Sequence, residues 1–125
     1  MIQICFPIKP VACQSVKFMK NGHAYQPKPK MAYKKTIAQI AKLRMGSTPP
    51  TTKPLIVRLW FEYATAKKQS MGAFKTTRPD IDNLLKGFLD ALNGIVWQDD
   101  AQICRISASK NYGEKDAIYL EIEEI

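Results

Sequence analysis

The sequence contains few of the residues that build common metal and disulfide sites. Its 125 residues include one histidine, His23, and three cysteines, and no two cysteines form a C-x-x-C pair. A multi-histidine zinc site, a cysteine zinc ribbon and a disulfide framework are therefore excluded. Because an odd number of unpaired cysteines fits a reducing compartment, we expect a cytoplasmic protein. We expect Cys5, Cys13 and Cys104 to be buried or half-buried small hydrophobes.

Long apolar runs and the common cofactor and nucleophile motifs are also missing. No stretch approaches the roughly 18 apolar residues that span a bilayer, and the opening MIQICFPIKP has no basic leader. We therefore expect neither a transmembrane helix nor a signal peptide. The sequence has no G-x-S-x-G, Walker A or G-x-G-x-x-G motif, so it offers no sign of the corresponding hydrolase, P-loop or dinucleotide sites.

Acidic residues are absent from the first half of the chain. Residues 1–61 contain eleven Lys or Arg and no Asp or Glu, whereas residues 62–125 contain eight Lys or Arg and eleven acids. The two halves therefore carry +11 and −3 within a total of +8. Five of the acids lie within residues 80–100. A basic body with one acidic cluster suggests a nucleic-acid binder with a cation site, although a solvated basic surface would give the same total charge.

Hydrophobic periodicity predicts a single α+β domain over residues 1–125, with a small mixed sheet packed against two main helices. The predicted helices are 31–45 and 81–93, and the predicted strands are 2–6, 55–64, 102–109 and 117–124. We expect the last two strands to form a hairpin around Gly113, residues 95–97 to form a short strand or a turn, and residues 65–79 to form a basic loop.

Three apolar stripes define the expected core. The stripes are Ala32, Ile37, Ile40, Ala41 and Met45 in the first helix, Val57, Leu59, Phe61 and Tyr63 in the second strand, and Ile81, Leu84, Leu85, Phe88, Leu89 and Leu92 in the second helix. Each stripe follows the period of its element, which places its members on one face.

Two aspartates stand at the start of the second helix. If Asp80 is still extended, its carboxylate and that of Asp82 can converge, and a divalent cation would relieve their repulsion. Oxygen ligands of this kind favour Mg²⁺ or Mn²⁺ over Zn²⁺. Asp100, in the pair Asp99–Asp100, could supply a third ligand. A D-x-D pair that only caps the helix and adds surface charge is the simpler alternative, because the motif is common.

Lys86 follows Asp82 at the helical spacing of four residues, and Asp90 follows Lys86 at the same spacing. These three residues can form an ion-pair ladder on the helix surface, worth roughly 0.3–0.5 kcal/mol per pair. Alternatively, the Lys86 ammonium can lie beside a scissile phosphate and stabilise the charge that develops in the transition state.

Taken as one string, RPDIDNLLKGFLDALNGIVWQDDAQI (residues 78–103) resembles the signature of the RusA-type Holliday-junction resolvases. In that family the pattern D-x-D-N-x-x-K is followed by a helix, a short turn and W-x-D-D-x-Q. The resemblance implies that Asp80, Asp82 and Asp100 bind metal, that Lys86 is catalytic, and that Asp90 and Asp99 support them. Some members carry a run of arginines before the first aspartate, whereas here Pro79 follows Arg78.

The resemblance implies a Mg²⁺-dependent endonuclease, for which Mn²⁺ can substitute, that resolves four-way DNA junctions by paired symmetric nicks in recombination and repair. Because such a junction is nearly two-fold symmetric, we expect a homodimer, and strand 55–64 could supply its interface. A non-enzymatic nucleic-acid-binding module and a nuclease for other branched DNA remain alternatives. The candidate phosphate contacts are Lys28, Lys30, Lys34, Lys35, Lys67, Lys68, Lys75 and Arg78.

Overall fold

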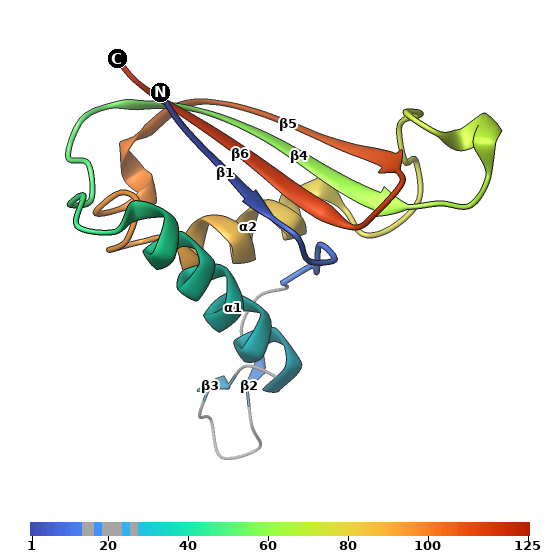
Figure 1. Cartoon of the computed structure of the whole chain (residues 1–125). Coiled ribbons are helices and arrows are strands. Elements are labelled where there is room, and N and C mark those ends of the chain that lie inside the picture. The colour runs from blue at the N-terminus through green and yellow to red at the C-terminus, as the bar shows by residue number, and fades with distance from the viewer. Residues whose placement is uncertain (14–16, 19–23, 26–27) are drawn as a thin grey trace.

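A four-stranded mixed sheet with two helices on one face forms the body of the molecule (Figure 1). The structure, a computed structural model, describes the backbone of residues 1–13, 17–18, 24–25 and 28–125, and the side chains of residues 1–13 and 30–125. This arrangement confirms the predicted α+β class. Among the described residues, no helix has the length and apolar character needed to cross a membrane.

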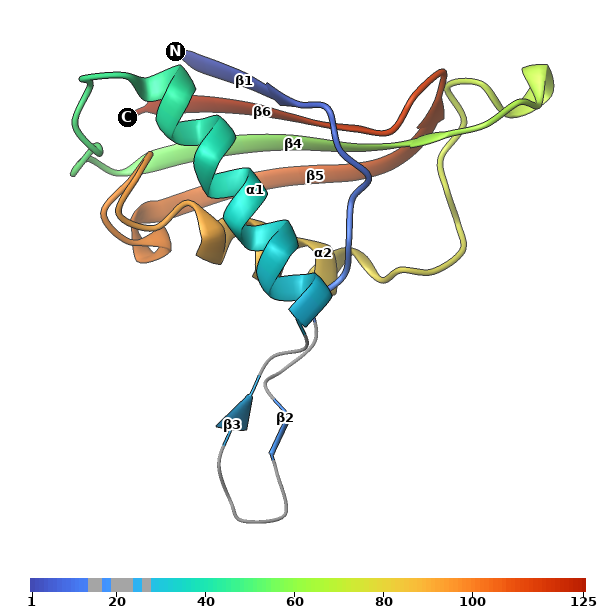
Figure 2. The same ribbon diagram turned by 60° about the horizontal axis from the view of Figure 1, so that its bottom comes forward.

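The sheet has the strand order β1-β6-β4-β5, and a two-stranded pair, β2-β3, stands apart from it (Figure 2). β4 pairs antiparallel with β6 and parallel with β5, while β1 pairs antiparallel with β6. The strands are β1 (Ile2–Phe6), β2 (Lys17–Phe18), β3 (Ala24–Tyr25), β4 (Leu55–Ala64), β5 (Ile103–Gly113) and β6 (Ala117–Glu124). The helices are α1 (Lys28–Met45), α2 (Ile81–Ala91) and the 3₁₀ turns η1 (Lys68–Ser70) and η2 (Asp100–Gln102).

The predicted hairpin around Gly113 is wrong, because β4 lies between β5 and β6. β5 follows α2 and pairs parallel with β4, so β4, α2 and β5 form a β-α-β unit. A parallel pair needs a crossover of this kind, and α2 supplies it. The alternation of apolar residues identified both closing strands, but it carries no information about which strand each one pairs with. β5 also extends to Gly113, four residues beyond the predicted end.

Residues 95–97 form a turn rather than a strand, since only Trp97 among them makes isolated bridges, to Thr51 and Asn93. α2 ends at Ala91, two residues earlier than predicted, and Gly94 adopts a φ of 79° just beyond it. α1 begins three residues earlier than predicted, with Pro29 in its first turn. A proline is tolerated there because the N–H groups of a first helical turn have no partner within the helix.

The core lies between the inner face of the sheet and the two helices. The predicted stripe of β4 is buried, and so are Leu84 and Phe88 of α2 and Leu92 just after the helix. In α1 the prediction of Ala32 is wrong: Ala32 is exposed, and Tyr33 is buried in its place. The buried face of α1 therefore repeats every four residues, and it consists of Tyr33, Ile37, Ala41 and Met45.

The prediction for the cysteines holds only for Cys13. Cys13 is buried, whereas Cys5 and Cys104 are exposed. Cys5 alternates with the buried Ile4 and Phe6 along β1, so the pleat turns its side chain to the outer face of the sheet.

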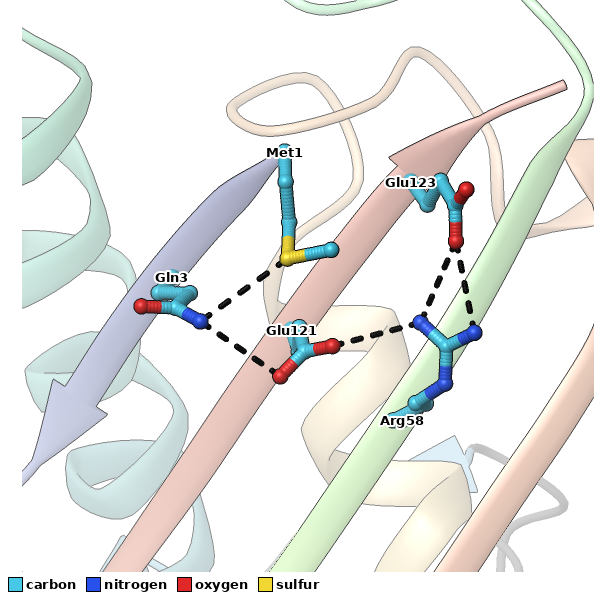
Figure 3. A network of polar contacts seen from close by, with 5 residues as sticks. All are labelled: Met1, Gln3, Arg58, Glu121 and Glu123. Atoms are coloured by element: carbon cyan, nitrogen blue, oxygen red, sulfur yellow. Dashed lines mark hydrogen bonds and ion pairs between the residues drawn. The ribbon is translucent and has the colours of Figure 1, made fainter.

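The outer face of the sheet carries a polar network rather than a helix (Figure 3). Arg58 of β4 pairs with Glu121 at 3.2 Å and with Glu123 at 3.3 Å, both on β6, and Gln3 of β1 donates to Glu121 at 3.5 Å. The network places two carboxylates and the single guanidinium of Arg58 on this face, so the three groups carry a net charge of −1. A polyanion therefore gains little on this face, and the helix side becomes the place to look for the functional site.

Candidate active site at the start of helix α2

The first part of the site is a pair of exposed carboxylates at the N-terminal end of α2. Asp80 is the N-cap residue, with extended backbone angles of φ −70° and ψ 142°, and its side chain makes no capping hydrogen bond. Asp82 lies in the first helical turn and is also exposed. Among the described residues, neither carboxylate forms an ion pair. The Asp80 carboxylate therefore does not cap the helix, which was the simpler explanation of this D-x-D pair.

Lys86 is exposed one turn beyond Asp82 on the same helix. The ion-pair ladder through Asp90 is not formed, because Asp90 instead accepts from Lys34 of α1 at 3.0 Å. This contact joins the two helices. Within the part of the chain that the structure describes, the Lys86 ammonium has no carboxylate partner.

The second acidic pair lies beyond the other end of α2. Asp99 closes a capping box at the start of η2: its side chain accepts from Ala101 N–H at 3.1 Å, while its own N–H donates to Gln102 at 2.9 Å. Asp100 is half-buried, and its N–H donates to Asn93 Oδ1 at 2.9 Å. Asp99 therefore shapes the turn, and Asp100 presents a carboxylate held beside Asn93.

The three aspartates predicted to bind metal do not gather in one chain. Asp80 and Asp82 precede or begin the eleven residues of α2, and Asp100 is held by Asn93 just after them. A helix of that length rises about 16 Å. Accordingly, the described residues contain no group of three His, Cys, Asp or Glu side chains close enough to hold one metal ion.

Comparison with known proteins identifies the family of the chain. The family described as Endodeoxyribonuclease RusA matches residues 7–123. The chain belongs to this family. A protein of Lactococcus phage r1t named crossover junction endodeoxyribonuclease rusA is 35% identical over 89 residues, which cover 70% of this chain and 68% of the relative. An uncharacterized protein of Bacillus subtilis (strain 168), YqaN, is 42% identical over 50 residues, which cover 40% of this chain and 35% of that protein.

A RusA-family nuclease with these side chains has a donor set suited to a hard divalent cation. Asp80 and Asp82 offer carboxylate oxygens that are exposed and free of capping bonds, the ligand type that Mg²⁺ and Mn²⁺ prefer. The pair fits such an ion as part of a ligand set. It does not complete one, because Asp100 stands at the far end of α2.

Some of the residues predicted to contact phosphate are exposed, whereas others already contact groups within the protein. Lys35, Lys67, Lys68 and Arg78 are exposed, and Lys30 is half-exposed. Lys34 is engaged with Asp90. Lys75 is also engaged, since its ammonium lies 5.1 Å and 5.3 Å from the ring centres of Tyr63 and Tyr112. The side chain of Lys28 lies outside the described residues.

In the loop before the site, Lys75 lies beside two tyrosine rings whose pKa values are shifted in opposite directions. Lys75 donates to Thr77 Oγ1 at 2.7 Å. Contact with Thr77, followed by the nearby Lys75 ammonium, lowers the pKa of the Tyr112 phenol. In contrast, burial raises the pKa of Tyr63, the other ring beside Lys75, to about 12.

Two residues of the site were missed in the sequence analysis. Asn93 is absent from the predicted site residues, yet its side chain accepts hydrogen bonds from the Asp100 N–H and the Trp97 indole. Its place inside the 78–103 signature was the available signal. Lys110 donates to the backbone just before Asp80, and no local pattern in the sequence points to it, because the two segments are about thirty residues apart.

Proposed function

We propose that this protein is a Mg²⁺-dependent endonuclease, with Mn²⁺ as a substitute cation, that cuts four-way DNA junctions in recombination and repair in the cytoplasm. The observation that carries the proposal is the uncapped pair Asp80 and Asp82, followed one turn later by the unpartnered Lys86 among the described residues. The phage relative named as a crossover junction endodeoxyribonuclease supports the choice of junctions as the substrate.

The side chains divide the work. Asp80 and Asp82 would hold the cation, which when bound supplies an activated water and stabilises the leaving oxygen. Lys86 places a positive charge beside the scissile phosphate, where it stabilises the negative charge of the transition state. The N-terminal end of α2 adds a positive partial charge that also favours the phosphate.

The third carboxylate gives the proposed homodimer a chemical reason. Asp100 cannot reach the Asp80–Asp82 pair of its own chain across the length of α2. If Asp100 is a metal ligand, it binds the cation together with Asp80 and Asp82 of a second copy of the chain. Each metal site then needs residues from both chains. Two such sites related by a two-fold axis would match the two nicks that a four-way junction requires. A mass of one chain in gel filtration at micromolar concentration would contradict this dimer.

DNA contact is proposed for the exposed basic side chains that flank the site. Arg78 lies two residues before Asp80, and Lys67 and Lys68 lie in the loop that leads into it. Lys30 and Lys35 lie on α1. Lys28 stays in the predicted set because it precedes them on the same helix. We leave Lys34 and Lys75 out of this set, because their ammonium groups already have partners within the protein.

The test is incubation of the protein with a labelled four-way junction, and separately with a matched linear duplex, in Mg²⁺ or in EDTA. We expect paired nicks in the junction only, and only with Mg²⁺. Asp82→Asn should lower the rate of cutting by about 100-fold or more, since even outer-shell changes at metal sites cost 10–100-fold. Junction binding should persist, because the substitution removes a negative charge near phosphate.

Glu114→Gln is the matched control, because Glu114 is exposed in the turn between β5 and β6 and loses the same charge. It should cut at the wild-type rate. Binding without cutting in both Mg²⁺ and Mn²⁺ would instead identify a non-enzymatic binding module. Equal cutting of flaps and junctions would identify a nuclease for other branched DNA.

A further inference from the structure

Lys110 of β5 contacts the segment that leads into the site. Its ammonium donates to the carbonyl oxygens of Thr77 and Pro79, each at 2.8 Å. Lys110 pairs with the buried Phe61 in the β4–β5 register, so its side chain leaves the sheet on the inner face, where α2 lies. Hydrogen bonds from a charged donor are roughly twice as strong as neutral ones.

The position of these two carbonyl groups connects Lys110 to Asp80. The Pro79 carbonyl and the Asp80 nitrogen belong to the same planar peptide unit. A hydrogen bond to the Pro79 oxygen therefore fixes the orientation of the peptide plane that leads into Asp80. The Asp80 side chain makes no capping bond of its own. The direction of the Asp80 carboxylate therefore depends on the backbone just before it, whose carbonyl groups accept from Lys110.

Residue 110 also anchors the incoming side of the same loop. Its carbonyl accepts from Lys75 N–H at 2.8 Å, and the neighbouring Tyr112 exchanges bonds with Gly72 and Ala73 at 2.9 Å each. The segment 72–79 is thus tied to the edge strand β5 at both ends. Because β5 is part of the main sheet, the loop brings Asp80 to a position set by the sheet.

We propose that Lys110 is a positioning residue that sets the direction of Asp80 relative to Asp82 for cation binding, an inference that rests on the proposed function. Two of the three ammonium donors are used inside the protein, so Lys110 acts through the backbone rather than on phosphate. The electrostatic effect of Lys110 has the opposite sign: removing a positive charge near a cation site would by itself tighten cation binding. A positioning role therefore predicts weaker binding where charge alone predicts stronger binding.

The test compares Lys110→Met, which keeps the length of the side chain and removes its donors, with Lys110→Arg, which keeps charge and donors. Lys115→Met is the matched control, since Lys115 is an exposed lysine in the β5–β6 turn. Binding of Mn²⁺ alone is measured by the electron paramagnetic resonance signal of the free ion. Cutting of the junction is then measured over a range of Mg²⁺ concentrations.

We expect Lys110→Met to weaken Mn²⁺ binding about tenfold, within the range for outer-shell residues, and to raise the Mg²⁺ concentration for half-maximal cutting similarly. Lys110→Arg should recover most of this loss, and Lys115→Met should match wild type. Unchanged or tighter Mn²⁺ binding by Lys110→Met would overturn the inference, and so would an equal loss in Lys110→Arg.

Thermal unfolding checks that each variant is folded, and Lys110→Gln, which keeps one amide donor group, replaces Lys110→Met if the latter does not fold. The same criteria then apply to Lys110→Gln. Failure of the wild-type protein to bind Mn²⁺ or to cut would overturn the proposed function and this inference with it. Wild-type binding and cutting with no effect at Lys110 would overturn the inference alone.

Discussion

Asn93 shows how a single side chain can join two parts of a sequence signature. Its Oδ1 accepts from the Trp97 indole N–H at 2.8 Å and from the Asp100 N–H at 2.9 Å. Trp97 is fully buried, so this bond provides the partner that its N–H would otherwise lack. Asn93 therefore fixes the turn after α2 and the place of Asp100 together.

We predict that Asn93→Ala lowers the free energy of unfolding by about 1–3 kcal/mol, the cost of leaving a buried donor unsatisfied. Cutting of the junction should fall as well, because Asp100 loses its anchor. Urea unfolding measures the first effect, and the junction assay measures the second. Gln98→Ala, a change at an exposed residue of the same turn, is the control. Equal stability of the two variants would show that Asn93 has no structural role.

For single residues, sequence patterns indicate which side chains lie close together only when these residues are near one another in the chain. Asp82 and Lys86 lie four residues apart in α2, and Asp80 directly precedes the helix, so their closeness followed from their spacing in the sequence. The partners Lys34–Asp90 and Lys110–Pro79 join segments 56 and 31 residues apart. No local pattern could identify them, because those contacts exist only after the sheet and helices have packed.

Helix α2, at whose start the candidate site lies, is fixed on two sides. Leu84, Phe88 and Leu92 pack into the core, and Phe88 meets Phe6 and Phe61 edge-to-face with ring centres 5.1 Å and 6.1 Å apart. On another side, Cys13 N–H donates to the Asn83 carbonyl at 3.0 Å. Burial also raises the pKa of the Cys13 thiol.

Gly87 permits the close approach of α2 to Cys13. A Cβ atom at position 87 would lie 2.2 Å from Cys13 Sγ and 2.5 Å from Cys13 Cβ. We predict that Gly87→Ala lowers the free energy of unfolding by about 1–3 kcal/mol through overpacking. This would outweigh the gain of about 1 kcal/mol that alanine brings to a helix interior.

The control is a double-mutant cycle with Cys13→Gly, which removes both clashing atoms. Urea unfolding of the four proteins should show that Gly87→Ala costs less in the Cys13→Gly background. A Gly87→Ala protein as stable as wild type would contradict the close approach.

The elements themselves followed from periodicity, with errors mainly at their ends. β1, β4 and β6 have the predicted bounds, because each alternates between a buried and an exposed face. The pairing of β5 did not follow, since alternation is the same in parallel and antiparallel strands. The early start of α1 was not predicted, because a proline such as Pro29 disfavours the interior of a helix, whereas a first turn accommodates it.

The whole molecule is an incomplete catalyst if Asp100 serves the partner chain. We predict that Asp82→Asn and Asp100→Asn proteins are each inactive alone, and that mixing them restores nicking of one strand. In a mixed dimer, one site receives intact Asp80 and Asp82 from one chain and intact Asp100 from the other. Nick formation on a labelled junction measures the recovery.

Mixing Asp82→Asn with Asp80→Asn is the control, because both changes then affect the same part of every site. That mixture should stay inactive. Absence of recovery in the first mixture, with subunit exchange verified by mass, would place Asp100 outside the site of the partner.

The strand order also determines when this chain can complete its fold. β6 comes after the other described strands in the sequence, yet it lies between β1 and β4. Its Ile122 and Leu120 face Ile2 and Ile4 of β1. β1 therefore has no partner in the sheet until β6 has left the ribosome. Such long-range pairing slows folding and keeps apolar strands exposed for longer. During synthesis, β1 and the inner face of β4 are consequently the segments most in need of protection from aggregation.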